Sequence, residues 1–129
     1  MKKPYSILIV DDDKFLLDMY HKKFERLGIE AAISVGPAEA LEKLREGSKP
    51  DILVLDIIMP GMDGLELLET IRKEHLSDSS LVVMLTNENE ADKIERAKAL
   101  GAVGYIVKST SIPSEVADQI IHIADEHTA

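Results

Sequence analysis

The chain has 129 residues, of which 45% are hydrophobic and 30% charged, with a formal net charge of −9 at pH 7 and no cysteine. This length and composition fit one globular domain, residues 1–129, and exclude a fibre, a disordered tail, a disulfide framework and a thiolate site. The acidic charge argues against direct nucleic-acid binding, and no apolar run approaches the roughly 20 residues of a membrane span, so we expect a cytoplasmic protein without membrane contact.

Short apolar segments alternate with amphipathic ones along the whole chain. In order, the first half predicts a strand at 7–10, a helix with an apolar stripe at 16–27 that stops at Gly28, a weaker strand at 30–35, a helix from Pro37 that ends before Gly47, and a strand at 52–55. The second half predicts a helix at 64–75, a strand at 81–85, a helix capped by Asn89 that ends at Gly101, a strand at 103–107 and a helix from Pro113.

Most of the predicted strands are continuous apolar runs rich in β-branched residues, which is typical of parallel strands buried on both faces. Parallel strands joined by helices with right-handed crossovers form a single-domain, three-layer α/β sandwich, here around a five-stranded sheet. In such sheets the functional crevice lies at the carboxyl ends of the strands. The residues that end the strands are therefore the first candidates for a functional site.

Four predicted strands end in polar residues that suit one chemistry. The first ends in Asp11, Asp12 and Asp13, the third in Asp56, the fourth in Thr86 and the fifth in Lys108. Crowded carboxylates repel one another unless a cation intervenes, and either a lysine or a bound Mg²⁺ can supply the charge. An aspartate in this setting can attack phosphorus and form an aspartyl phosphate, while a hydroxyl donates to a phosphoryl oxygen. Singly, each residue is typical of a turn, a cap or a solvated surface, but together they predict a phosphoryl site.

Four segments carry a resemblance to a known family. They read ILIVDDD, DILVLDIIMPGMDGLEL, VVMLT and GAVGYIVKS, and in order and spacing they closely resemble the receiver domain of two-component response regulators. The resemblance covers nearly the whole chain. It implies a flavodoxin-like fold with strand order 2-1-3-4-5, and a signalling domain that catalyses only its own phosphorylation and dephosphorylation rather than an enzyme acting on other molecules.

The resemblance also implies a role for each residue of the site. Asp56 is the phosphoacceptor; Asp11, Asp12, Asp56 and the Ile58 carbonyl hold Mg²⁺; Lys108 contacts the phosphoryl group; Thr86 is the switch hydroxyl; and Tyr105 is the aromatic that moves with it. The implied phosphoryl donor is a histidine kinase or a histidine phosphotransfer protein. We expect a monomer or weak dimer that signals to a downstream protein, or a piece of a longer regulator whose output domain is missing.

Three positions in this sequence bear on how it departs from the family pattern. Ser109 stands where the family usually has proline after the lysine, and because a cis bond before a non-proline residue costs about 2.5 to 4 kcal/mol, we predict a trans Lys108–Ser109 peptide. Asn87 replaces the small residue that frequently follows the switch threonine. Ile58 places an apolar side chain two positions beyond Asp56, and we predict that its bulk slows hydrolysis of the phosphoryl group by excluding water.

Signal output is expected through the helix that follows the switch threonine. Its inward face is predicted to be mostly small, with Ala91 and Ala97 beside Ile94 and Leu100, so few large contacts would hold it in place. A helix of small residues can also pack closely and stay fixed, and the sequence leaves both possibilities open.

Partner contacts are expected where apolar side chains lie outside the predicted core. Phe15 and Met19 fall off the apolar stripe of the first helix, and the apolar arc of the last helix is wide enough to leave Ile121 only partly covered. Scattered surface hydrophobic residues without a role are an equally good explanation.

Two other interpretations of the site stay open. A haloacid dehalogenase-like phosphatase also begins with a strand and an Asp-x-Asp pair, which Asp11 and Asp13 would supply with Asp11 as nucleophile. Against it, Phe15 stands where threonine or valine is expected, the chain is short, and the later acidic pair is missing. The other is a receiver-like binding module that never needs phosphate. The presence of Ser109 in place of the usual proline supports this interpretation.

Overall fold

The computed structural model describes residues 5–87, 91–108 and 112–127 of the chain. In these ranges strands and helices alternate: β1 (Ser6–Asp11), α1 (Lys14–Arg26), β2 (Glu30–Val35), α2 (Pro37–Arg45), β3 (Ile52–Leu55), α3 (Gly64–Lys73), β4 (Leu81–Thr86), α4 (Ala91–Ala99), β5 (Gly104–Val107) and α5 (Pro113–His127). Every strand and helix predicted from the sequence is present.

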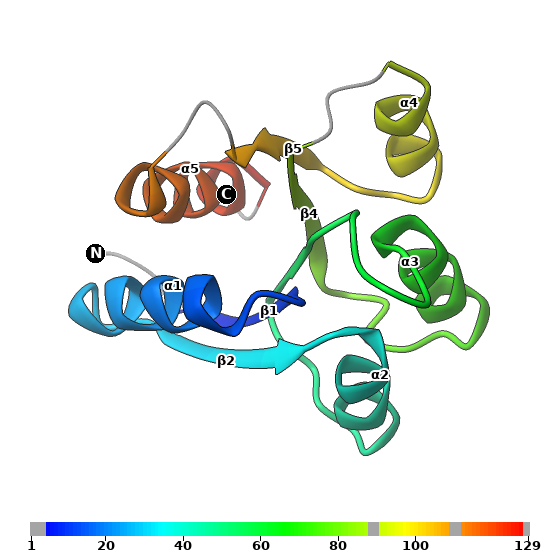
Figure 1. Ribbon diagram of the computed structural model, residues 1–129, viewed down its shortest axis with the longest axis horizontal. Helices are drawn as coiled ribbons and strands as arrows, with labels where there is room; N and C mark the ends of the chain where they lie inside the picture. Colours follow the sequence, from blue (N-terminus) through cyan, green and yellow to red (C-terminus); the bar gives the residue numbers. More distant parts are fainter. Residues whose placement is uncertain (1–4, 88–90, 109–111, 128–129) are drawn as a thin grey trace.

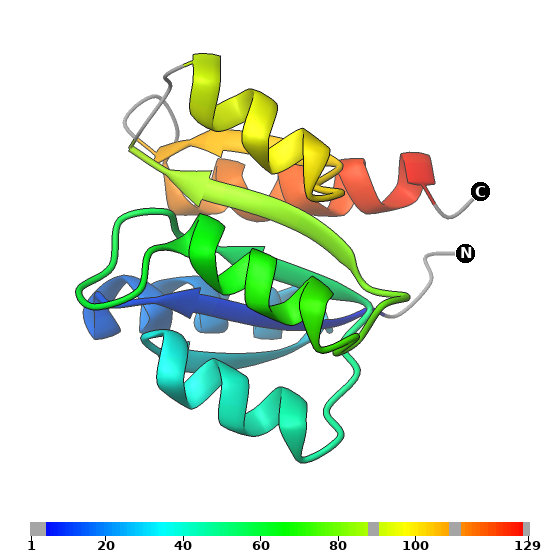
Figure 2. The same cartoon turned by 90° about the vertical axis from the view of Figure 1, so that its right-hand side faces the viewer.

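The five strands form one parallel sheet in the order β2-β1-β3-β4-β5. Helices α1 and α5 cover one face, and α2, α3 and α4 cover the other (Figure 1). β3 therefore lies at the centre of the sheet, between β1 and β4. The strand arrows point to a common edge (Figure 2). The predicted three-layer, flavodoxin-like sandwich with strand order 2-1-3-4-5 is confirmed.

Side chains of the strands fill two cores, one on each face of the sheet. Ile7 and Ile9 of β1 belong to the core that includes the buried residues of α1 and α5, whereas Leu8 and Val10 belong to the core beneath α2 and α3. All four are 1 to 2% exposed. Burial on both faces explains why the strand sequences are continuously apolar rather than alternating.

Some element boundaries and the burial of some side chains differ from prediction. Helix α3 ends at Lys73, short of residue 75, because the chain turns through left-handed backbone at His75 (φ 55°) and Ser77 (φ 48°). The predicted cap Asn89 and the predicted trans Lys108–Ser109 peptide involve residues outside the described ranges. The expectation that Ile121 is only partly covered is wrong, since it is 6% exposed in the core under α5. Within the described ranges, no helix combines the length and apolar character that a bilayer span requires.

Candidate functional site

The parallel sheet brings the predicted site residues to one edge. Asp11 and Thr86 are the last residues of β1 and β4, Asp56 follows β3 directly, and Lys108 follows β5. Val10 pairs with Leu55 in the sheet, and the Asp56 amide donates to the Val10 carbonyl at 3.0 Å. This bond sets the main chain of Asp56 beside the end of β1, so the two buried acids are neighbours across adjacent strands.

Three carboxylates gather closely enough to share one cation. Asp11, Asp12 and Asp56 each offer an oxygen, and these oxygens all lie within 4.8 Å of one another. Asp11 and Asp56 are 1% and 5% exposed, whereas Asp12 is exposed. Mg²⁺ binds hard carboxylate oxygens and keeps several waters, so two buried carboxylates beside a solvent-facing one fit this ion. The third acid of the run, Asp13, is not in the group.

Asp13 has a structural task instead. Its carboxylate accepts a hydrogen bond from the Leu16 amide at 3.1 Å and so caps the first turn of α1. The Asp13 amide in turn donates to Asp11 Oδ1 at 3.0 Å. The cap thus starts α1 immediately after the site. The bond from the Asp13 amide holds the Asp11 carboxylate in its orientation.

Lys108 supplies the positive charge in the crevice. Its Nζ lies 2.6 Å from Asp11 Oδ2 and 3.3 Å from Asp56 Oδ2. Burial by itself would lower the pKa of Lys108, but its hydrogen bond to Asp11 and the charges of Asp56 and Asp11 raise the pKa above its ordinary value. Lys108 is therefore fully protonated at neutral pH.

One lysine does not balance the negative charge of the cluster. Burial, followed by the charge of Asp11, raises the pKa of Asp56 to about 7, although Lys108 opposes the shift. Partial desolvation next to the buried acids and a hydrogen bond with Asp11 also raise the pKa of Asp12. Both shifts show that a further positive charge would be favourable here. A bound divalent cation, or the uptake of a proton by one of the carboxylates, would supply that charge.

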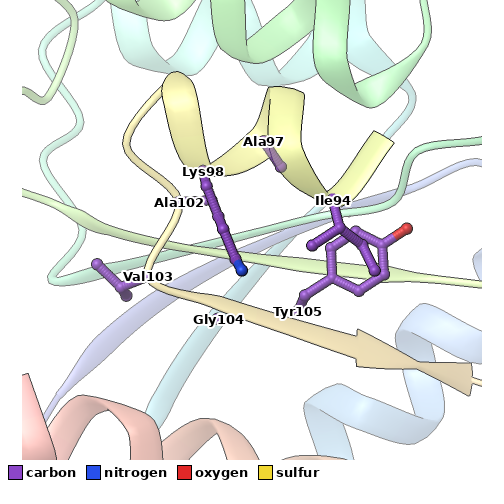
Figure 3. A pocket seen from close by; sticks show the side chains of 7 residues that line it. All are labelled: Ile94, Ala97, Lys98, Ala102, Val103, Gly104 and Tyr105. Atoms are coloured by element: carbon purple, nitrogen blue, oxygen red, sulfur yellow. The ribbon is translucent and has the colours of Figure 1, made fainter. Parts of the chain in front are cut away.

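The predicted switch residues lie on the neighbouring strands. Thr86 is fully buried at the end of β4 and pairs with Val107 in the sheet. Tyr105 of β5 is half-buried on the side of α4, where with Ile94 it lines a cavity of about 190 Å³ beneath that helix (Figure 3). Tyr105 thus projects from β5, the strand that Lys108 follows, toward the helix predicted to move.

Helix α4 has few buried side chains of its own but is tied to α3 near its C-terminal end. Ala97 is its buried residue, and Ile94 is half-buried, but Ala91 is exposed, so its predicted inward position is wrong. Two side chains of α3 reach α4 and the residue that follows it: Glu69 pairs with Arg96 of α4 at 3.1 Å, and Arg72 Nε donates to the Leu100 carbonyl, just beyond the helix, at 2.9 Å.

Exposed large apolar side chains mostly follow the carboxyl ends of strands along the chain. Among the described residues these are Phe15 (78% exposed), Met19 (38%), Val35 (40%), Ile58 (51%) and Ile112 (59%). The sequence predicted the exposure of Phe15 and Met19 but missed Val35 and Ile112. Their positions, at the end of β2 and shortly before α5, were the available signal, because strand-end loops face solvent.

Sequence comparisons identify relatives over most of the chain. Residues 7–120 match the family described as the response regulator receiver domain. Transcriptional regulatory protein YvrH of Bacillus subtilis is 36% identical over 115 residues, which are 89% of this chain and 47% of that protein. Sporulation initiation phosphotransferase F of the same organism is 31% identical over 115 residues, covering 89% of this chain and 90% of that protein. The chain therefore spans about half of YvrH but nearly all of the phosphotransferase.

Solved structures agree with the sequence relatives. The CheY-like response regulator receiver domain protein from Methanospirillum hungatei is 31% identical with a TM-score of 0.83, over 96% of each chain. Chemotaxis protein CheY4 of Vibrio cholerae is 26% identical with a TM-score of 0.83, over 94% of this chain and 99% of that one. The fold, the strand order and the sequence match all lead to the same family.

Proposed function

The chain belongs to the response regulator receiver domain family, and on that premise we propose that Asp56 accepts a phosphoryl group from a phosphohistidine of a histidine kinase or histidine phosphotransfer protein. The observation that carries this proposal is the pair of buried carboxylates, Asp11 and Asp56, with Lys108 between them. Such domains are signalling modules rather than enzymes in the usual sense, so the proposed catalysis is limited to phosphorylation and dephosphorylation of Asp56 itself.

The contacts favour Asp56 over Asp11 as nucleophile. Both oxygens of Asp11 are engaged, Oδ2 with Lys108 at 2.6 Å and Oδ1 with the Asp13 amide at 3.0 Å. Asp56 meets Lys108 at the longer distance of 3.3 Å. Hydrogen bonds to both oxygens stabilise the negative charge of a carboxylate and therefore make it a weaker nucleophile. This argues against the phosphatase alternative, in which Asp11 would be the nucleophile.

In the proposed reaction an oxygen of ionised Asp56 attacks phosphorus. The new P–O bond forms as the P–N bond breaks, and the electron pair of that bond stays on the leaving imidazole nitrogen. Lys108 stabilises the charge on the phosphoryl oxygens and thereby offsets their repulsion with the carboxylate. Asp11, Asp12, Asp56 and the Ile58 carbonyl would hold Mg²⁺, which when bound supplies further neutralising charge. Water later attacks the phosphorus, the P–O bond to Asp56 breaks with its electron pair left on the carboxylate, and inorganic phosphate is released.

The proposed output uses the residues around the fourth and fifth strands. The Thr86 hydroxyl would donate to a phosphoryl oxygen and draw its loop toward the site, and Tyr105 would move with it. The receiver would then act on a downstream protein, or on an output domain elsewhere in a longer chain. We propose no direct nucleic-acid contact by this domain, since its formal charge of −9 opposes binding to phosphate backbones. A cytoplasmic location and a monomer or weak dimer belong to the same proposal.

Acetyl phosphate provides the direct test. With Mg²⁺ present, the protein should gain the mass of one phosphoryl group, and the Asp56→Asn variant should gain none. A label that persists in Asp56→Asn but disappears in Asp11→Asn would favour the phosphatase-like alternative. An amide spectrum that responds to neither Mg²⁺ nor beryllium fluoride would favour a binding module that never needs phosphate.

A further inference from the structure

Helix α3 starts in direct contact with the main chain of Asp56. A Cβ atom added to Gly64, the first residue of the helix, would overlap the carbonyl oxygen of Asp56 and lie 2.8 Å from its carbonyl carbon and 2.9 Å from Ile57 Cα. The backbone of Gly64 is not in the left-handed region that favours glycine. Glycine is therefore required at this position by space and not by conformation.

Neither side of this contact yields easily. The Gly64 amide donates to the Ile57 carbonyl at 2.8 Å, and a reciprocal capping box between Asp63 and Glu66 closes the first turn of α3. The helix is then held on the sheet by Leu65, Leu67, Leu68 and Ile71, all 0 to 2% exposed. On the other side, the Asp56 amide is bonded to the Val10 carbonyl at 3.0 Å. The peptide that follows Asp56 thus lies between a fixed strand and a fixed helix.

We propose that Gly64 is a positioning residue for phosphoryl transfer to Asp56. Because it has no side chain, the first turn of α3 can rest on the Asp56–Ile57 peptide and fix the backbone rotation that aims the Asp56 carboxylate. The same rotation determines where the following residues, including the Ile58 carbonyl, lie relative to the cluster. The inference rests on the proposed function of Asp56, but it assigns a role to a residue that does not contact the phosphoryl group.

Gly104 offers a matched control. It and Gly64 are the two described glycines whose backbone lies outside the left-handed region, so an alanine is conformationally acceptable at both. A Cβ at Gly104 would also be too close to a neighbour, but that neighbour is Ile123 Cδ1 at 2.7 Å, the end of a flexible side chain. Gly104→Ala therefore introduces the same methyl group next to a side chain, that of Ile123, which can move aside.

The experiment compares Gly64→Ala, Gly104→Ala and the parent by three measurements: urea unfolding, Mg²⁺ affinity by calorimetry, and the rate of acetyl-phosphate labelling at saturating Mg²⁺. We expect Gly64→Ala to bind Mg²⁺ about 10-fold more weakly and to be labelled on the order of 100-fold more slowly, because small displacements of reacting groups have effects of this size. Gly104→Ala should stay within about 2-fold of the parent in both, since its methyl group does not reach the reacting groups. Amide shifts of Ile57 and Ile58 should change only in Gly64→Ala.

Equal Mg²⁺ affinity and labelling in Gly64→Ala and Gly104→Ala would overturn the inference. If Gly64→Ala does not fold, Asp63→Ala provides the test instead, because it removes the capping box and so loosens the same first turn of α3. We expect Asp63→Ala to bind Mg²⁺ about 3-fold more weakly than the parent. An unchanged Mg²⁺ affinity would overturn the inference. Failure of the proposed function looks different, since the parent itself would bind Mg²⁺ without being labelled on Asp56. The calorimetric difference between the two alanine variants would still test the positioning role in that case.

Discussion

Lys108 donates its hydrogen bond to Asp11, at 2.6 Å, although the proposed nucleophile is Asp56, whose Oδ2 lies 3.3 Å from the same nitrogen. The three side chains are largely withdrawn from water, with 12% of Lys108, 1% of Asp11 and 6% of Asp56 exposed. Because both acids are already within reach of one ammonium group, Lys108 can turn from Asp11 toward a phosphoryl oxygen without passing through solvent.

The first prediction concerns the removal of that ammonium group. Lys108→Met leaves two buried carboxylates without their cation, so the free energy of unfolding at pH 8 in EDTA should fall by about 3 kcal/mol. Mg²⁺ should restore part of this loss and bind more tightly than in the parent, because the cluster is more negative. Urea unfolding with and without Mg²⁺ measures both effects.

Lys98→Met is the matched control, since Lys98 pairs with Glu95 at 3.8 Å and its side chain is 65% exposed. Its removal should change the free energy of unfolding by less than about 0.5 kcal/mol, with no dependence on Mg²⁺. A Lys108→Met protein as stable as the control variant would mean that Lys108 does not compensate the buried carboxylates.

The second prediction follows from the raised pKa of Asp56, about 7 against an ordinary 3.8. The folded protein holds this proton more tightly than the unfolded chain, so the stability that protonation contributes is fully present below about pH 4 and is lost as the pH rises through 7. Asp56→Asn keeps a neutral side chain at every pH. Without divalent cations it should be more stable than the parent at pH 8, on the order of 2 to 4 kcal/mol, and the gain should fade toward pH 4.

Unfolding curves between pH 4 and pH 8 in EDTA give this difference directly. Asp18→Asn removes one negative charge from the exposed surface of α1 and should change stability by less than about 0.5 kcal/mol across the range. A gain for Asp56→Asn that is independent of pH would show that burial of the ionised Asp56 is not its cause.

Sequence patterns predicted the sheet well because they record burial. The strands β1, β3 and β4 are buried on both faces, and a continuous apolar run is what that environment selects. The end of α3 was harder, since the chain leaves the helix through left-handed backbone at His75 and Ser77, where glycine would be the usual signal.

The candidate site was predictable in its membership but not in its pairings. Parallel strands bring Asp11, Asp56 and Lys108 to one edge whatever their side chains do. Which acid receives the lysine depends on distances that differ by less than 1 Å, 2.6 against 3.3 Å, and no spacing along the sequence encodes such a difference. The task of Asp13 as a helix cap and the contact of Gly64 with Asp56 likewise depend on how helices seat on the sheet.

The third prediction concerns the lifetime of the phosphoryl group. Ile58 follows Asp56 by two positions, and its side chain is 51% exposed. We expect its bulk to shield the aspartyl phosphate from attacking water, so Ile58→Asn should lose phosphate several-fold faster than the parent. Phosphate release after rapid removal of the phosphodonor measures the rate. Val35→Asn, another exposed apolar residue at the carboxyl edge, should hydrolyse at the parental rate, and identical rates for all three proteins would refute the shielding.

The last prediction addresses how α4 is held. The guanidinium of Arg72 donates to the Leu100 carbonyl at 2.9 Å, just beyond the end of α4, where a positive charge also suits the helix dipole. The residues nearer the start of α4 have fewer buried contacts, since Ala91 is exposed and Ile94 only half-buried. If a signal from Thr86 moves this helix, the start should therefore move while the end stays in place.

Arg72→Met should release that fixed end. Loss of one charged hydrogen bond is worth roughly 1.5 kcal/mol, so hydrogen exchange of amides 97–101 should accelerate about 10-fold in the free protein. Labelling of Asp56 by acetyl phosphate should stay at the parental rate, because Arg72 does not contact the site. Arg45→Met, which breaks the exposed pair with Glu74 at 2.6 Å between α2 and α3, should leave exchange in α4 unchanged. Equally slow exchange at 97–101 in both variants would show that the packing of Ala97, and not Arg72, holds this end of α4. The fixed point about which the helix moves would then lie elsewhere.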